Sequence, residues 1–71
     1  MPGNFSSILG KRIRTLRKAK GWSQVEMADL LAINRGYLSE LENGKRDPSL
    51  AILKTIADGL SITMSKLFEG L

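Results

Sequence analysis

Helix start signals recur along this chain at short intervals, and they limit it to short helices. The most explicit is Ser23-Gln24-Val25-Glu26, in which the serine hydroxyl can accept from the glutamate amide while the glutamate side chain bonds back to the serine amide. Between such signals, apolar residues recur at every third or fourth position, which is the period of an amphipathic helix. No stretch alternates branched apolar and polar residues as a half-buried strand does. The sequence therefore predicts an all-α fold.

Five helices are predicted from these caps and from the apolar periodicity. Their N-caps are Ser6 or Ser7, Ser23, Asn34, Ser49 and Thr63. Glycines end three of them, at Gly21, Gly44 and Gly59. The second helix runs to about Leu31, and the fifth carries Met64, Leu67 and Phe68. We expect one compact five-helix domain over residues 7–71, preceded by a flexible arm of residues 1–6, with no internal repeat.

The chain is short and lacks two residue types on which much of enzyme chemistry depends. Its 71 residues suffice for one small domain, and its hydrophobic content of 42% is that of an ordinary globular chain. It contains no cysteine and no histidine, which excludes disulfides, thiolate metal sites and the commonest general base and zinc ligand. Its acidic residues are scattered, and no phosphate-binding glycine loop is present. We therefore expect neither an enzyme nor a bound metal or cofactor.

Membrane and export signals are also missing from the sequence. No apolar run approaches the roughly 18–20 residues that a membrane-spanning helix needs. The N-terminus, Met1-Pro2-Gly3-Asn4-Phe5-Ser6-Ser7, has no basic segment followed by an apolar block, so it does not resemble a signal peptide. These observations predict a soluble cytoplasmic protein without a membrane partner.

Positive charge is concentrated near the N-terminus. The first 22 residues carry six cations and no acid, and the remaining 49 residues carry five cations and seven acids. The six cations all lie between residues 11 and 20. Such a basic end favours an anionic partner, although a dispersed basic surface can also serve solubility alone.

Two of the predicted helices form the outline of a helix-turn-helix motif. They span about 23–31 and 34–44 and are separated by Ala32 and Ile33, which matches the three- to four-residue turn of that motif. Close crossing of the helices needs a small residue, which Ala28 supplies, and apolar anchors, which Leu38 and Leu41 supply together with Ile33. Each of these residues could serve an unrelated core, but their combination with the capping box favours the motif.

Three long segments make the pattern more specific than the motif alone. They are Leu9-Gly10-Lys11-Arg12-Ile13-Arg14, Arg17-Lys18-Ala19-Lys20-Gly21-Trp22-Ser23-Gln24 and Leu38-Ser39-Glu40-Leu41-Glu42-Asn43-Gly44-Lys45-Arg46-Asp47-Pro48-Ser49-Leu50. With them, residues 9–68 resemble the Cro/phage-repressor-type, or xenobiotic-response-element, helix-turn-helix family. The resemblance implies a lambda-repressor-like domain that dimerises, places its third helix in the major groove of a palindromic operator and regulates transcription.

The opening of the third helix narrows the resemblance further. Asn34-Arg35-Gly36-Tyr37 is similar to the same segment of restriction–modification controller proteins, which are also short chains. The chain equally resembles small phage-type and conjugative-element repressors. The sequence does not separate these roles.

The resemblance implies a set of DNA-contacting residues in and around the third helix. They are Gln24, Asn34, Arg35, Gly36, Tyr37, Ser39, Glu40, Asn43, Lys45 and Arg46. Gln24 stands in the first turn of a helix, where free amides and the helix dipole favour a phosphate. Arg35 stands where base edges are read and can bind guanine O6 and N7 with two hydrogen bonds. Asn43, Lys45 and Arg46 follow the helix, where they would hold the DNA backbone without reading sequence.

Several of these residues have a second interpretation. Tyr37 can pack on a thymine methyl or bond a phosphate, or it can shield the crevice between the second and third helices. Ser39 and Glu40 are weaker candidates, and Glu40 either accepts from a cytosine amine or faces water. Gln24, Arg35 and the turn residues 43–46 can also be ordinary solvated side chains.

Other positions concern structure rather than contacts with DNA. Arg17 and Glu42 match a pair that forms an interhelical salt bridge in relatives. Ala32 stands where the family usually has glycine, which predicts strain if that turn needs a left-handed backbone. Gly36 inside the third helix costs about 1 kcal/mol relative to alanine and can instead permit close approach to DNA. Trp22 replaces an aliphatic residue and is expected to cover the core.

Apolar residues of the last two helices are the candidates for a dimer interface. They are Ile52, Met64, Leu67, Phe68 and Leu71. The expected partners are double-stranded DNA and a second copy of the chain, with RNA polymerase as a further partner. The alternative is a protein-binding module such as an antitoxin, which would hold its partner through exposed apolar residues such as Leu30, Ile52, Met64, Phe68 and Leu71.

Overall fold

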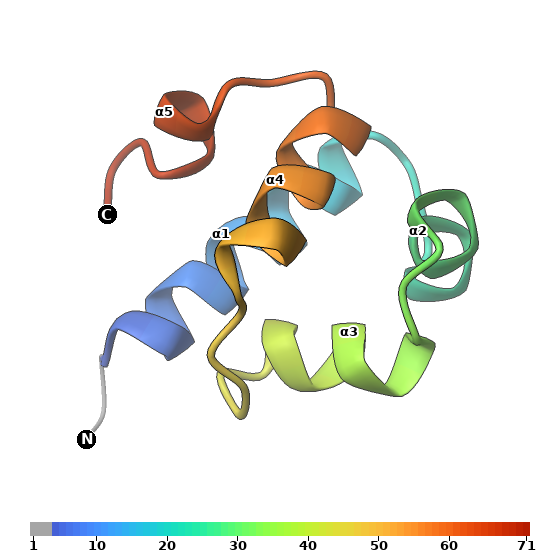
Figure 1. Cartoon of the computed structure of the whole chain (residues 1–71), viewed down its shortest axis with the longest axis horizontal. Helices are drawn as coiled ribbons and strands as arrows, with labels where there is room; N and C mark the ends of the chain where they lie inside the picture. The colour runs from blue at the N-terminus through green and yellow to red at the C-terminus, as the bar shows by residue number, and fades with distance from the viewer. Residues whose placement is uncertain (1–3) are drawn as a thin grey trace.

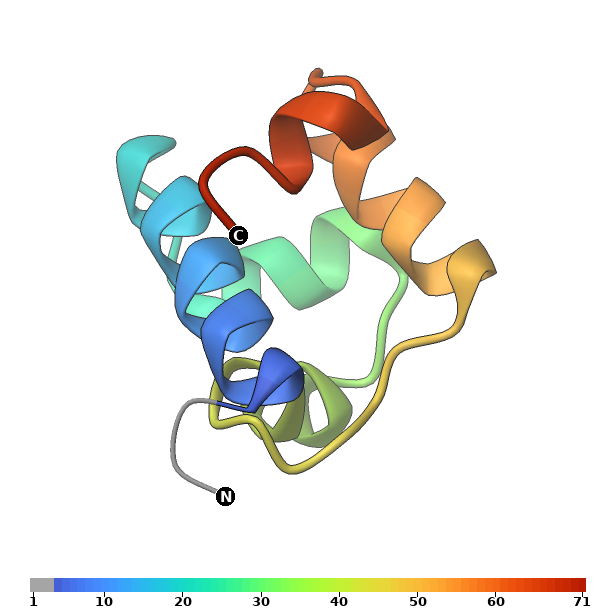
Figure 2. The same ribbon diagram turned by 90° about the vertical axis from the view of Figure 1, so that its left-hand side faces the viewer.

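The computed structural model describes residues 4–71, which form five α-helices and no strand. The helices are α1 (Phe5–Ala19), α2 (Gln24–Leu31), α3 (Arg35–Glu42), α4 (Leu50–Gly59) and α5 (Met64–Leu67). The predicted all-α, five-helix fold is therefore confirmed. α3 lies along one edge of the molecule and α5 along the opposite edge, with α4 between them (Figures 1 and 2).

α1 begins earlier than the sequence predicts. Its N-cap is Asn4, whose side chain accepts a hydrogen bond from the Ser7 amide at 2.8 Å, so the predicted caps Ser6 and Ser7 both lie inside the helix. The Ser6 hydroxyl instead donates to a carboxylate oxygen of Asp47, in the loop between α3 and α4. Of the expected arm, residue 4 caps the helix, residues 5 and 6 are helical, and residues 1–3 lie outside the described part of the chain.

The other helices begin where the sequence predicts. Their N-caps are Ser23, Asn34, Ser49 and Thr63. The capping box is complete, because the Glu26 amide donates to the Ser23 hydroxyl at 3.0 Å and the Ser23 amide donates to Glu26 Oε1 at 2.8 Å. These hydrogen bonds with the backbone and side chain of Ser23 also lower the pKa of Glu26. Local capping chemistry thus sets most of the helix boundaries.

One hydrophobic core joins the five helices. Its buried members are Leu9, Ile13, Met27, Ala28, Ile33, Leu38, Leu41, Leu53, Ile56, Ala57, Leu60 and Leu67. α3 packs against α1 and α2, while α4 packs against α2 and α5. Trp22 is half-buried at the edge of this core, as expected. Leu67 is among the predicted dimer residues, but it is 0% exposed; a side chain in the core has no surface to offer a partner, so that assignment is wrong.

The turn between α2 and α3 is closed by a left-handed residue. Ala32 has φ 55° and ψ 40°. Its amide donates to the carbonyl of Asp29 at 3.3 Å, and the Ile33 amide donates to the carbonyl of Ala28 at 2.9 Å. An L-residue in this conformation bears a steric cost of roughly 1–2 kcal/mol. The left-handed backbone on which the predicted strain depends is therefore present.

The same turn recurs between α4 and α5. Ser61 has φ 58°, and the Ile62 amide donates to the carbonyl of Ala57 at 2.9 Å. The segments 28–33 and 57–62 share the pattern Ala-Asp-x-Leu-x-Ile. The two turns therefore have the same local sequence pattern and the same hydrogen bond.

Replacing Ala32 with glycine is expected to raise the free energy of unfolding by about 1 kcal/mol, because glycine adopts the left-handed backbone without steric cost. Part of that relief is offset by the larger entropy of glycine in the unfolded chain. The matched control is Ala51→Gly, which changes an exposed alanine with a helical backbone in α4 and should destabilise the protein. Urea unfolding followed by circular dichroism measures both variants. A loss of stability in Ala32→Gly would show that this turn does not strain alanine.

Candidate nucleic-acid interface

The side of α3 that faces away from the core carries most of the predicted contact residues. Leu38, Leu41 and Glu42 are buried on its inner side. The outer side carries exposed and half-buried residues, which are Arg35, Gly36, Ser39, Glu40 and Asn43, whereas Tyr37 is half-buried and packs against the core. The side chain of Asn34 caps the helix by accepting from the Tyr37 amide at 2.9 Å. The first turn of α3 is thereby held in place at an edge of the molecule (Figures 1 and 2).

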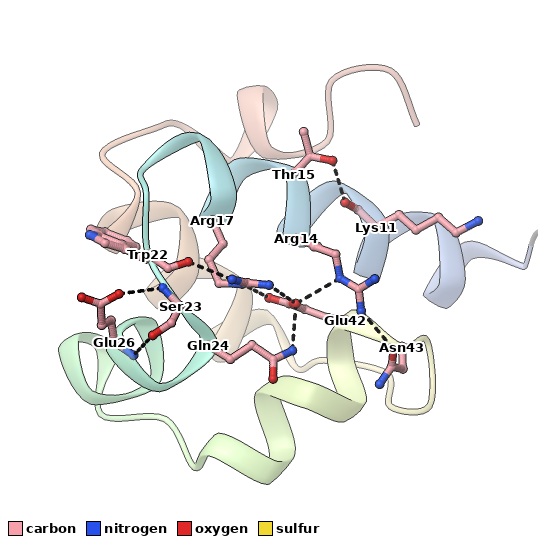
Figure 3. A network of polar contacts seen from close by, with 10 residues as sticks. All are labelled: Lys11, Arg14, Thr15, Arg17, Trp22, Ser23, Gln24, Glu26, Glu42 and Asn43. Carbon is pink, nitrogen blue, oxygen red and sulfur yellow. Dashed lines mark hydrogen bonds and ion pairs between the residues drawn. The ribbon is translucent and has the colours of Figure 1, made fainter.

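Glu42 holds the last turn of α3 to α1 and α2 (Figure 3). Its buried side chain accepts from Arg17 Nε at 2.8 Å and from Arg17 Nη2 at 3.0 Å. Gln24 Nε2 and Arg14 Nε donate to Glu42 Oε1 at 3.0 Å and 3.4 Å. Arg17 Nη1 also donates to the carbonyl of Trp22 at 2.8 Å. The structure therefore contains the Arg17–Glu42 ion pair and surrounds it with further donors.

The surroundings of Glu42 favour its charged form. Burial raises the pKa of this carboxyl, but hydrogen bonds from Arg17 and Gln24, the charge of Arg17 and the hydrogen bond from Arg14 together outweigh burial and lower the pKa below its ordinary value. A buried ion is stable in a protein when its charge is paired and its remaining lone pairs find donors. Glu42 meets both conditions.

Gln24 lies in the first turn of α2 and faces α3. Its half-buried side chain is oriented by the hydrogen bond from Nε2 to Glu42. An amide nitrogen carries two hydrogens, so the same group can also donate to a phosphate. The phosphate contact of Gln24 stays a prediction. The sequence did not reveal that Gln24 also donates a hydrogen bond to Glu42.

Arg46, in the loop after α3, folds back over that helix. Its Nε donates to Glu40 Oε1 at 2.8 Å, and the centre of its guanidinium lies 5.4 Å from the centre of the Tyr37 ring, within the range of a cation–π contact. The side chains of Arg46 and Glu40 remain 55% and 46% exposed. Glu40 thus has an ion-pair partner that neither sequence interpretation included.

The remaining predicted contact residues differ in their surroundings. The Lys45 side chain is exposed, while its amide donates to the carbonyl of Glu40 at 2.8 Å. Asn43 is exposed, but its Oδ1 accepts from Arg14 Nη2 at 3.1 Å. A Cβ built on Gly36 would meet the Asn34 side chain alone, at 3.2 Å, so the helix is open to close approach at that point.

The sequence of this fold matches a known protein family. Residues 13–67 match the family HTH_3, described as helix-turn-helix. The chain belongs to this helix-turn-helix family.

Relatives of known sequence or structure agree with this family. The chain is 44% identical over 62 residues to the uncharacterized HTH-type transcriptional regulator YazB of Bacillus subtilis (strain 168), covering 87% of this chain and 90% of YazB. The crystal structure of the restriction–modification controller protein C.AhdI from Aeromonas hydrophila matches with a TM-score of 0.83 at 39% identity, over 87% of this chain and 94% of C.AhdI. The controller protein C.Esp1396I, in the structure of its tetramer with its natural 35 base-pair operator, matches with a TM-score of 0.83 at 28% identity, over 93% of this chain and 88% of that one.

The resemblance inferred from the sequence is therefore confirmed. The helix-turn-helix chain is a DNA-binding regulator of transcription, and its relatives include restriction–modification controller proteins. Within residues 4–71, this helix-turn-helix protein has no helix with the length and apolar content needed to cross a bilayer.

In this helix-turn-helix protein, the basic segment of residues 11–20 is only partly a free cationic surface. Arg14 and Arg17 bind residues at the end of α3. Arg12 donates to the carbonyls of Lys66 and Leu67 at 2.8 Å and 3.3 Å, at the end of α5, where a helix favours a cation. The exposed cations of the segment are Lys11, Lys18 and Lys20. The charge pattern of the sequence therefore overstates the surface that this segment offers to an anion.

An apolar surface lies where the start of α1 meets the residues after α5. Phe68 is half-buried, and its ring centre is 6.2 Å from that of Phe5, which is 57% exposed. Leu71 is also exposed, whereas the predicted dimer residues Ile52 and Met64 are half-buried. Phe5 is not among the predicted dimer residues, because residues 1–6 are predicted to form a flexible arm.

Proposed function

We propose that this regulator binds a palindromic operator in double-stranded DNA as a homodimer and places α3 in the major groove. The observation that carries the proposal is the outer face of α3, where a capped first turn presents Arg35 beside the open backbone at Gly36. Helices of this motif read base edges with their N-terminal residues. The anchoring of the last turn through Glu42 supports the proposal, because base readout needs side chains held on a rigid element.

Residues on both sides of α3 suit the DNA backbone. Gln24 offers an amide at the start of α2, where the helix dipole also favours a phosphate. Lys45 and Arg46 add two exposed cations directly after α3. In the proposed complex these residues set the position of α3, while Arg35 and Tyr37 read bases.

A symmetric dimer would present two copies of α3 to equivalent half-sites, whose centres are about 34–36 Å apart in complexes of this kind. The apolar surface of Phe5, Phe68 and Leu71 supports self-association, because exposed apolar side chains gathered in one place favour a protein partner. The likeness to C.AhdI and C.Esp1396I supports a role as a restriction–modification controller. In this proposal the regulator acts in the cytoplasm and has RNA polymerase as a further partner.

Selection of bound duplexes from a randomised DNA library, followed by sequencing, tests the proposal. We expect an enriched palindrome whose half-site centres lie about one helical turn apart. A folded protein that enriches no sequence would contradict the proposal and favour the antitoxin-like alternative, in which the partner is a protein.

Arg35→Ala is expected to abolish the preference at one base position of each half-site, which corresponds to about 1–3 kcal/mol of discrimination, while leaving the salt dependence of binding nearly unchanged. Lys45→Ala is the matched control, since it removes an exposed cation directly after the same helix. It should weaken binding to all sequences and reduce the salt slope by about one unit. Binding titrations against single-base variants of the selected duplex, at several salt concentrations, measure both effects. A uniform loss in Arg35→Ala would instead identify Arg35 as a phosphate contact.

A further inference from the structure

Glu40 is an acidic side chain on a surface that the proposed function turns toward DNA. Of the two acids in α3, Glu42 is buried and Glu40 is half-buried on the outer side of the helix. A free carboxylate at this place would repel phosphates. It is instead paired with Arg46, and the Tyr37 ring lies under the same guanidinium.

We infer that Glu40 is a specificity-determining residue, which acts by holding Arg46 away from phosphates unless the DNA sequence offers Glu40 another donor. In this way the Glu40–Arg46 ion pair lowers non-specific binding to DNA. The inference rests on the proposed function, because it assumes that the outer side of α3 meets DNA.

The exchange follows from which groups Glu40 and Arg46 can bind. Non-specific affinity depends on how many protein cations neutralise phosphates and release their counterions. While Arg46 is bound to Glu40, it adds little to that number. If Arg46 leaves for a phosphate on an unmatched sequence, the Glu40 carboxylate faces DNA without a donor.

A matching DNA sequence changes whether Arg46 binds Glu40 or a phosphate. In the major groove, a cytosine amine can donate to a glutamate carboxylate. Glu40 then gains a donor, and Arg46 becomes free to bind a phosphate. Both side chains are about half exposed, so they can exchange partners without disturbing the core.

The test measures binding of the whole protein to a short random-sequence duplex over a range of salt concentrations. Glu40→Gln should bind this duplex about two- to fivefold more tightly at low salt, a gain in the range expected for release of one exposed ion pair. Its salt slope should be steeper by about 0.9, as expected for one additional neutralised phosphate. On the duplex selected from the library the gain should be smaller, so the ratio of specific to non-specific affinity falls.

Glu69→Gln is the matched control. It removes the same charge and breaks a similar exposed ion pair, Glu69 with Lys66 at 2.9 Å, next to α5 at the edge opposite α3. It should leave the salt slope unchanged. The salt slope of the double variant Glu40→Gln/Arg46→Ala should equal that of Arg46→Ala, since the additional phosphate contact in Glu40→Gln is made by Arg46. Thermal unfolding of each variant establishes that it is folded.

Two results would overturn the inference while the proposed function stands. One is an equal gain in Glu69→Gln, which would make net charge the cause. The other is a steeper salt slope of Glu40→Gln/Arg46→Ala than of Arg46→Ala, which would mean that the additional phosphate contact is not made by Arg46. Failure of the wild-type protein to bind either duplex would instead contradict the proposed function, and the inference with it.

Discussion

Glu42→Gln is expected to lower the free energy of unfolding by about 3–5 kcal/mol, the range found when one partner of a buried ion pair is removed. The substitution keeps the shape of the side chain but leaves the Arg17 guanidinium buried without its counter-charge. A domain of 71 residues is stabilised by roughly 4–11 kcal/mol in total. The loss is therefore a large fraction of the total, and at the lower end of this range the variant would be unfolded. Urea unfolding at neutral pH measures the loss.

The same variant also tests the pH dependence of stability. The pKa of Glu42 is lowered in the folded protein, so its ionised form contributes stability above its ordinary unfolded pKa, and this contribution is lost as the pH falls through the folded pKa. Acidification should therefore destabilise the wild-type protein more than Glu42→Gln, and the two unfolding free energies should converge. Glu26 and Glu69, whose pKa values are also lowered, keep some pH dependence in both proteins.

Glu69→Gln serves as the control for the loss of a paired carboxylate at the surface. Its ion pair with Lys66 is exposed on both sides, and exposed pairs contribute little to stability. We expect no substantial change in the unfolding free energy. A similar small change in Glu42→Gln would contradict the assignment of the Arg17–Glu42 pair as a structural tie between α1 and α3.

Gly10→Ala is expected to destabilise the protein by about 3 kcal/mol, near the upper end of the usual cost of overpacking. A Cβ at this position would lie 2.3 Å from the carbonyl oxygen of Leu41 and 2.7 Å from that of Glu42. Both atoms belong to the backbone of α3, so a side-chain rotation cannot relieve the clash. α1 and α3 would have to separate, and this would also stretch the hydrogen bonds of Arg17 to Glu42. Chemical denaturation measures the change.

Gly36→Ala is the matched control, because it makes the same substitution in a helix at a position where the added methyl meets one side-chain atom, Asn34 Oδ1 at 3.2 Å, and no backbone of another helix. Alanine is the better helix former by about 1 kcal/mol, so this variant should be as stable as the wild type or more stable. It should nevertheless bind the selected duplex less tightly if DNA approaches the backbone of α3 at Gly36. Equal destabilisation of Gly10→Ala and Gly36→Ala would show that the close packing of α1 on α3 is not what requires glycine.

The sequence by itself predicts most of the helix boundaries, since capping and turn formation involve residues only a few positions apart. Ser23 and Glu26 cap each other across three residues, and Ala32 closes the turn with carbonyls of the same helix. The spacing of apolar residues likewise indicates which side of α3 is buried. The predicted contact residues from Asn34 to Arg46 are close in sequence, and α3 with its loop keeps them together.

The partners of polar side chains depend on tertiary structure, because they join residues far apart in the chain. Ser6 lies inside α1 instead of capping it, and its hydroxyl donates to Asp47 across 41 positions. Arg12 and Arg14 are close together in the basic segment, but their side chains bind different places. Arg12 donates to a carbonyl at the end of α5, and Arg14 donates to Asn43 at the end of α3. Leu67 has the same apolar spacing as Met64 and Phe68, and only the packing of α5 on the core shows that Leu67 is buried. Helix positions were thus determined locally, whereas the charges left free for DNA were decided by which side chains the packed helices bring together.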